Sequence, residues 1–143
     1  MIMTLKITLL RGMYCRKAWA ANIELKESST LEALHFAIQQ VVAFDDDHLY
    51  SFFLSRTDRS RSREYFDHEN GLIYCKTLRD LFPLPDKQCL FYLFDWGDEW
   101  VFKISPSRKL PHEPVKGMKY PRMESESGVK PDQYPGDDDD EVE

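Results

Sequence analysis

The chain has 143 residues, of which 42% are hydrophobic and 13% aromatic, enough for one domain with its own core. It lacks a run of 18 apolar residues, which argues against a membrane-spanning helix, and its first ten residues lack the features of a secretory signal. The net charge of −6 is unevenly distributed. Residues 1–123 carry 18 Lys and Arg against 16 Asp and Glu, whereas residues 124–143 carry one Lys against nine acidic residues. We therefore expect a single, nearly neutral domain over 1–123 and an acidic, disordered tail over 124–143.

The three cysteines, Cys15, Cys75 and Cys89, are too few and too far apart for a disulfide framework or a thiolate zinc site. Their odd number favours free thiols in a reducing compartment, so we expect a cytoplasmic protein. The sequence gives no reason to expect a cofactor.

Hydrophobic residues occupy every second position of residues 3–10 and again of residues 19–25, which predicts two strands. Gly12, between them, suits a positive φ, so the two strands are expected to form a hairpin. Ser29 and Glu32 have the spacing of a capping box and precede apolar residues at intervals of three and four. This pattern predicts one main helix from about residue 30 to about residue 43.

The later elements are shorter. We expect a strand over 48–55, a polar loop over 56–71, a short helix over 78–82 that begins with a capping box, and two strands over 89–94 and 100–104. Residues 95–98 supply Gly and Asp for a tight turn between the last two strands. Six of the eight prolines lie between Pro106 and Pro135, so regular structure should fade into a Pro-rich C-terminal arm.

The order β-β-α-β-β-β, with the short helix before the last two strands, predicts an α+β fold. We expect a mostly antiparallel sheet with one main helix packed on one face, and a β-grasp-like arrangement as its specific form.

Two motifs carry a family resemblance, and the first consists of two stretches. Residues 30–40 (TLEALHFAIQQ) with residues 44–52 (FDDDHLYSF), and then residues 92–100 (YLFDWGDEW), are similar to signatures of one plasmid- and transposon-associated family. It is named after the third open reading frame of a root-inducing plasmid. The resemblance covers roughly residues 5–135 and implies a protein of uncharacterised function, with some members linked to mobile elements.

The chain departs from the family pattern at three places. Ala20 follows Trp19 where members often have Arg, and Phe102 stands where many have His. The usual C-terminal motif is reduced to residues 130–136. If these positions form a polar site in the family, part of it is lost here.

Four polar residues form the strongest candidate site: His35, His48, Asp95 and Asp98. Imidazole and carboxylate groups together suit zinc, which would make the protein a metal-dependent enzyme. The structural alternative is favoured, with the histidines bonded to nearby groups and the two Asp residues bonded to amides of the turn. We therefore expect no catalytic residue and no metal ligand.

The polar loop contains Arg56, Arg59, Arg61 and Arg63, with aromatic rings at residues 65 and 66. Such a loop can contact phosphates and stack bases, although charged loops are more often only solvated. On the nucleic-acid hypothesis, the acidic tail would compete for this loop as a mimic of phosphates.

Trp96 lies at the tip of the 95–98 turn. It is a binding anchor if it is exposed, although packing back onto the C-terminal arm is the favoured alternative. The leading hypothesis is a non-catalytic interaction module with a protein or nucleic-acid partner and no membrane association.

Overall fold

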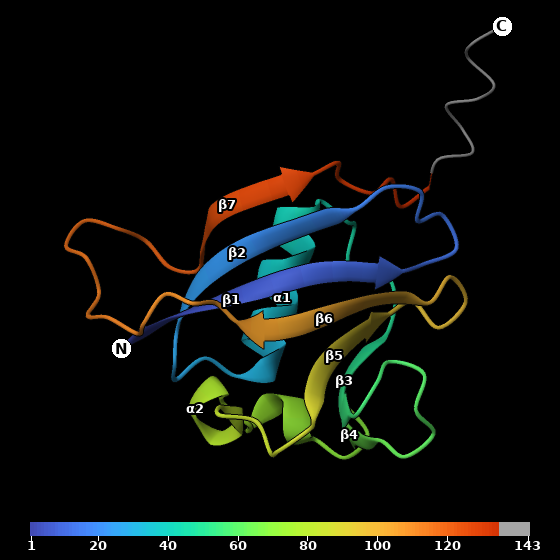
Figure 1. Cartoon of the computed structure of the whole chain (residues 1–143), viewed down its shortest axis with the longest axis horizontal. Coiled ribbons are helices and arrows are strands. Elements are labelled where there is room, and N and C mark those ends of the chain that lie inside the picture. Colours follow the sequence, from blue (N-terminus) through green and yellow to red (C-terminus); the bar gives the residue numbers. More distant parts are fainter. Residues whose placement is uncertain (135–143) are drawn as a thin grey trace, which may run out of the picture.

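The structure is a computed structural model that describes residues 1–134. Seven strands form one sheet in the order β4-β3-β5-β6-β1-β2-β7, and each strand pairs antiparallel with its neighbours (Figure 1). In chain order, the elements are β1 (Ile2–Arg11), β2 (Trp19–Lys26), α1 (Leu31–Val42), β3 (Tyr50–Ser55), β4 (Glu64–Phe66), η1 (Leu72–Tyr74), α2 (Leu78–Leu81), β5 (Cys89–Phe94), β6 (Trp100–Pro106) and β7 (Arg122–Gly128). The predicted class, a mostly antiparallel sheet with one main helix, is confirmed, whereas the strand pairing does not confirm the β-grasp-like arrangement.

The helix α1 covers one face of the sheet and is seen behind the strands in Figure 1. Its apolar side and the alternate residues of β1, β2, β5 and β6 form one buried cluster. The helix begins at Thr30, whose hydroxyl accepts a hydrogen bond from the amide of Ala33, so the predicted capping box of Ser29 and Glu32 does not form. The second predicted capping box is confirmed, since Thr77 and Asp80 exchange both hydrogen bonds at the start of α2.

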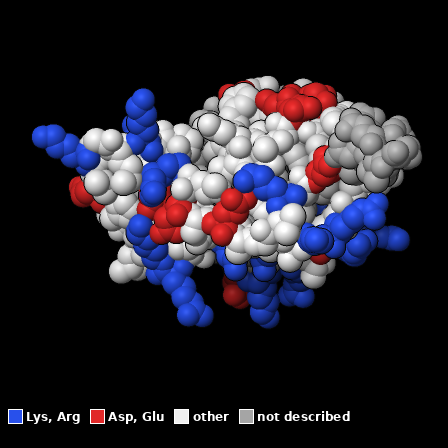
Figure 2. Space-filling model, turned by 90° about the horizontal axis from the view of Figure 1, so that it is seen from above, with Lys and Arg blue, Asp and Glu red and all other residues white. Residues whose placement is uncertain are grey.

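The opposite face of the sheet has an apolar half and a polar half. Phe53, Phe91, Leu93 and Val101 form a separate buried cluster on β3, β5 and β6, and the guanidinium of Arg63 lies 4.2 Å from the centroid of the Phe53 ring. Polar side chains line the other half, on β1, β2 and β7. In Figure 2, Lys and Arg side chains project along the lower side and at the left, and an acidic patch lies at the top.

The strand β7 crosses the predicted domain boundary. It pairs with β2 from Trp19 to Glu24, so the boundary expected after residue 123 falls inside a strand. Its polar sequence, RMESESG, hides it from a hydrophobic-pattern reading, because an edge strand with exposed side chains needs no apolar alternation. The remainder of the predicted tail, from 135 to 143, lies outside the described residues.

The predicted Pro-rich C-terminal arm is not confirmed, because the strand β7 lies within it. Residues 107–121 contain neither helix nor strand, apart from an isolated bridge between His112 and Ile2. The predicted 56–71 loop likewise contains the short strand β4. None of the helices within residues 1–134 is long and apolar enough to cross a membrane.

Gly12 is required for a reason other than the predicted positive φ. A Cβ atom at this position would lie 2.3 Å from Cε3 of the Trp100 ring, so the backbone of the β1–β2 turn rests directly on that ring. Only glycine allows such a close approach between backbone and ring.

Candidate functional site

The imidazole of His35 is buried on the sheet side of α1 and has a partner on each nitrogen. Its Nδ1 lies 2.6 Å from the hydroxyl oxygen of Tyr92 on β5, and its Nε2 lies 2.7 Å from Oδ1 of Asp46. The ring of Tyr50 stacks on it, with ring centroids 3.6 Å apart.

Gln39 connects the two hydrogen-bond partners of His35. Its Nε2 donates to the hydroxyl oxygen of Tyr92 over 2.9 Å, and its Oε1 accepts from the amide of Asp46 over 3.0 Å. The Asp46 carboxylate can only accept a hydrogen bond, so Nε2 of His35 carries a proton and donates to it. In the neutral ring Nδ1 then accepts from the O–H of Tyr92.

Burial lowers the pKa of His35, an effect only partly offset by the Asp46 carboxylate, so the ring is neutral at pH 7. In this arrangement neither ring nitrogen offers a lone pair to a metal or a substrate. The network therefore supports a structural role for His35.

His48 belongs to a second group of contacts. Its Nε2 lies 2.8 Å from the hydroxyl oxygen of Tyr134 and 3.3 Å from Oδ2 of Asp95. The Tyr134 hydroxyl donates to Oδ2 of Asp47 over 2.7 Å, and this hydrogen bond lowers the pKa of Asp47.

The neighbouring Gln133 is buried, donates to Oδ1 of Asp47 over 2.9 Å and accepts from the amide of Asp45 over 2.8 Å. We call Gln133 and Tyr134, with residues 45–48, the C-terminal latch. It ties the segment after β7 to the loop after α1.

The structure separates His35 from the other three residues of the predicted polar site. His48 and Asp95 are in contact, but within residues 1–134 no hydrogen bond or ion pair joins His35 to Asp95 or Asp98. In the same part of the chain, no group of three or more His, Cys, Asp and Glu side chains is arranged to hold a metal ion. A pocket of about 290 Å³ does open beside both histidines.

The turn between β5 and β6 is fixed by Asp95 rather than by Gly97. Asp95 has a φ of 66°, and its Oδ1 accepts from the amides of Gly97 over 3.0 Å and Asp98 over 3.3 Å. Its backbone amide donates to the carbonyl of Leu49, and the amide of Met13 donates to the carbonyl of Asp98. The turn is thus held from three directions, and Asp95 provides the amide contacts of the structural alternative.

Trp96 projects from this turn and is 50% exposed, whereas Trp19 and Trp100 are 1% and 0% exposed. Beside it lies a hollow of about 350 Å³ lined by both cations and carboxylates: Arg11, Arg59, Asp98 and Glu99. The structure therefore brings three predicted residues, Trp96, Asp98 and Arg59, to one end of the sheet. We call this surface, with Met13, the hairpin end.

The four arginines of the 56–63 loop have different surroundings. Arg63 donates to the carbonyls of Ser60 and Asp58 and to the hydroxyl of Tyr65, so it organises the loop from inside. Within residues 1–134, the side chains of Arg56, Arg59 and Arg61 make no hydrogen bond or ion pair and are exposed. Three arginines remain available for a partner.

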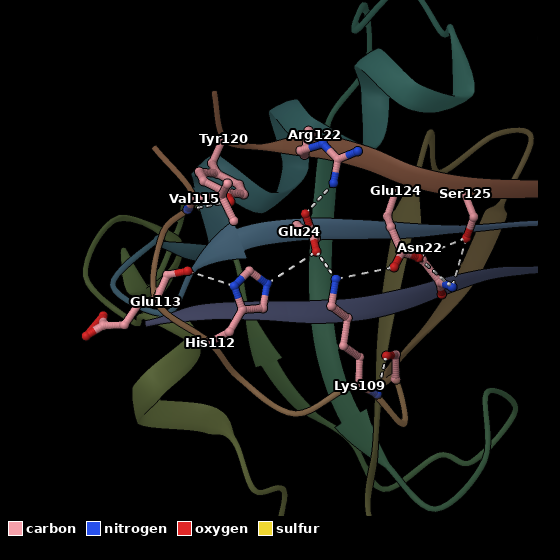
Figure 3. Close-up of polar contacts among 11 residues, drawn as sticks. Asn22, Glu24, Lys109, His112, Glu113, Val115, Tyr120, Arg122, Glu124 and Ser125 are labelled. Atoms are coloured by element: carbon pink, nitrogen blue, oxygen red, sulfur yellow. Dashed lines mark hydrogen bonds and ion pairs between the residues drawn. The ribbon is translucent and has the colours of Figure 1, made fainter. Parts of the chain in front are cut away.

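A buried carboxylate on β2 organises a further polar cluster (Figure 3). Glu24 is 1% exposed and accepts from Lys109 Nζ over 2.6 Å, from Arg122 Nη1, and from His112 Nε2 over 3.4 Å. Burial alone would raise the pKa of Glu24, but these hydrogen bonds outweigh it and lower the pKa to about 2. The cluster fastens the 107–121 segment to the sheet, and Lys109 also lies 3.5 Å from Oε2 of Glu124.

A family model described as "Plasmid pRiA4b ORF-3-like protein" matches residues 1–136. The chain belongs to this family. A crystal structure of a protein of unknown function, MM3350 from Methanosarcina mazei Go1, is similar in fold, with a TM-score of 0.69 and 24% sequence identity. The match covers 87% of this chain and 68% of that one. No curated protein matches the chain.

The pRiA4b ORF-3-like signatures map onto the contacts described above. The first contributes His35, Gln39, Asp46 and His48, and the second contributes Tyr92 and the 95–98 turn. The signatures of this family member thus mark the network that joins α1 to β5. Phe102, at the position where the resemblance leads us to expect His, is fully buried beside the Tyr92 ring, with centroids 5.8 Å apart.

Sequence reasoning missed Tyr92, Gln39 and Glu24 as polar partners. Tyr92 lies in the run CLFYLF and reads as apolar, and Gln39 looks like an ordinary helix residue. Glu24 stands between Ile23 and Leu25 in an alternating strand, where a charged residue is ordinary and gives no signal of burial. That position faces away from α1, and only the fold shows that the 107–121 segment covers it.

Proposed function

We propose that the protein is a non-catalytic protein-interaction module that contacts its partner through the hairpin end. The observation that carries this proposal is Trp96, a large aromatic side chain left half exposed on a turn that is fixed by hydrogen bonds. Interface hot spots are enriched in Trp and Arg, and a preorganised anchor loses little conformational freedom on binding. Met13, which is 64% exposed, extends the apolar contact next to this turn.

The charges around Trp96 favour a protein over a nucleic acid. Asp98 and Glu99 line the same hollow as Arg11 and Arg59, and carboxylates repel a phosphate backbone. Arg11 pairs with Glu99 over 3.1 Å, so groups of both charges are in direct contact here. Burial and the neighbouring Asp95 raise the pKa of Asp98. A surface of mixed charge around a Trp matches the usual composition of a protein interface.

The contacts of His35 support the proposal that the protein is not an enzyme. Both of its nitrogens are occupied by groups of the protein itself, so the alternative hypothesis, a metal-dependent enzyme, would lack His35 as a ligand. We also propose a reducing compartment such as the cytoplasm, a proposal supported by the three free thiols among the described residues.

The test compares wild type with Trp96→Ala as immobilised bait in a cell extract, with Leu110→Ala as the matched control. Leu110 is 80% exposed on the 107–121 segment, away from the hairpin end. We expect a protein retained by wild type and Leu110→Ala whose affinity, measured afterwards by calorimetry with purified components, falls at least tenfold with Trp96→Ala. Equal affinities for Trp96→Ala and wild type would overturn the proposal.

The nucleic-acid alternative is tested on the same molecule. Because Trp19 and Trp100 are buried, quenching of tryptophan fluorescence reports mainly on Trp96. Saturable quenching by a single-stranded oligonucleotide at low salt, abolished by Arg59→Ala with Arg61→Ala, would replace the protein partner by a nucleic acid.

A further inference from the structure

A second concave surface lies on the α1 side of the sheet and is separate from the hairpin end. It is the 290 Å³ pocket beside His35, built where the first turns of α1 meet the 45–49 loop, the start of β3 and η1. Its rim carries three large apolar side chains that are more than half exposed: Phe36 at 53%, Leu49 at 59% and Tyr74 at 54%. Tyr50, whose ring stacks on His35, is also among the lining residues. Exposed apolar side chains gathered in one hollow indicate a binding site rather than scattered surface residues.

The aromatic rings are accompanied by two carboxylates. Glu32 and Asp46 line the pocket, and none of its lining residues is Lys or Arg. Within residues 1–134, the side chain of Glu32 makes neither a hydrogen bond nor an ion pair. Asp46 accepts from the neutral ring of His35, which brings no compensating charge. Besides the tyrosines, the remaining titratable side chains in the lining are His48 and His68, so the two carboxylates face histidines but no permanent cation.

The pKa of Tyr50 is consistent with a negative electrostatic potential in the pocket. Burial raises the pKa of Tyr50, and the charges of Glu32 and Asp46 raise it further. A negative potential over aromatic faces is the environment in which an organic cation binds, because the ring quadrupole and the carboxylates attract it together.

We propose that this pocket binds the head group of an organic cation, an alkylammonium or guanidinium group. The rings of Phe36, Tyr50 and Tyr74 would contact the cation, Glu32 would balance its charge, and Leu49 would contact the aliphatic stem. The volume is at the lower end of the range for small-molecule pockets, roughly 300 Å³, and suits one head group with a short stem. The cation can come from a free amine or from a lysine or arginine side chain of a protein.

The experiment titrates choline into the full-length ¹⁵N-labelled protein and follows the amide resonances of Phe36, Leu49 and Tyr74. The neutral isostere 3,3-dimethylbutan-1-ol is titrated in parallel, with sodium chloride at matched ionic strength as a further control. We expect saturable shifts with choline and at least tenfold weaker binding of the neutral alcohol. Equal binding of both compounds, or no saturable shift with either, would overturn the proposal.

Two variants test the assigned residues. Glu32→Gln and Tyr74→Leu should each weaken choline binding about three- to tenfold, because one removes the charge and the other removes the ring while keeping an apolar side chain. Glu27→Gln, which lies outside the pocket, should leave the affinity unchanged. Wild-type affinity in both pocket variants, with their spectra showing a folded protein, would contradict the assignment.

The source of the cation is distinguished by two further ligands, acetyl-Gly-Lys-Gly amide and its arginine counterpart. Tighter binding of a peptide than of choline indicates a protein side chain, and the reverse indicates a free amine. Trp96→Ala should bind choline as wild type does, so failure of the hairpin end as an interface would leave this result intact.

Discussion

At the scale of single residues, His35 shows how burial decides the role of an ionisable group. Its ring lies between Tyr50, Tyr92 and Asp46, and each nitrogen has one partner. Protonation would force the Tyr92 hydroxyl, which now donates to Nδ1, to turn away from it. The neutral form is therefore part of the folded state.

This arrangement predicts a specific pH dependence. Because the pKa of His35 is lowered in the folded state, the unfolded chain binds more protons below the ordinary value of about 6.5. Stability should thus be complete above about pH 6.5 and should fall as the pH decreases below it. We expect the urea midpoint of wild type to drop more between pH 7.5 and pH 5 than that of His35→Gln.

The other three histidines are common to both proteins, so their contributions cancel in this comparison. Equal pH slopes would show that His35 does not titrate differently in the two states. If His35→Gln does not fold, the same sign is tested by NMR titration of the His35 ring in wild type, which must protonate below pH 6.5.

At the scale of elements, the cluster around Glu24 decides whether the 107–121 segment stays on the sheet. Glu24→Gln keeps the side-chain shape but removes the charge that Lys109, Arg122 and His112 share. Since Lys109 and Arg122 are partly exposed and screened by water, we expect a loss of about 2 kcal/mol in the free energy of unfolding at pH 7. Trypsin should also cleave faster at Lys116 and Lys119.

The fold stabilises the charged form of Glu24, whereas it stabilises the neutral form of His35. The pKa of Glu24 is lowered to about 2, so its contribution is present above about pH 4.5 and is lost as the pH falls towards 2. The difference between wild type and Glu24→Gln should therefore shrink at pH 3. Glu27→Gln is the control, since its pairing with Arg79 is exposed and should contribute less than about 1 kcal/mol. Identical stability and cleavage in the two variants would contradict the role of Glu24.

The elements also show which parts of the fold a sequence can predict. Strands and helices with a buried side, such as β1 and α1, can be predicted from the sequence because burial imposes a period on their apolar residues. β7 carries no such period, since its side chains are largely exposed and it is held to β2 by backbone and polar side-chain hydrogen bonds. His35 was recognisable as a polar residue on an apolar side, but its partners Tyr92 and Asp46 come from segments that only the fold brings together.

At the scale of the whole molecule, the loop formed by residues 45–49 connects the hairpin end with the pocket beside His35. Asp95 of the turn accepts from the amides of Gly97 and Asp98, while its own amide donates to the carbonyl of Leu49, which lines the pocket. His48, also in that loop, contacts the Asp95 carboxylate. A partner bound at the hairpin end would therefore stand close to the pocket, and a basic side chain of that partner is one source of the proposed cation.

The C-terminal latch holds this shared loop from the other side, and its removal is the remaining test of the assembly. A chain ending at residue 132 lacks Gln133, the acceptor for the amide of Asp45, and Tyr134, the donor to Asp47. We expect its free energy of unfolding in urea to be about 1–3 kcal/mol lower than that of a chain ending at residue 134, because a partly buried amide loses its partner. Tyr134→Phe in the longer chain removes only one exposed hydroxyl and should cost less than about 1 kcal/mol. Equal unfolding midpoints for the two truncated chains would show that the latch contacts do not stabilise the loop, and the fixed geometry of both proposed sites would then rest on the sheet alone.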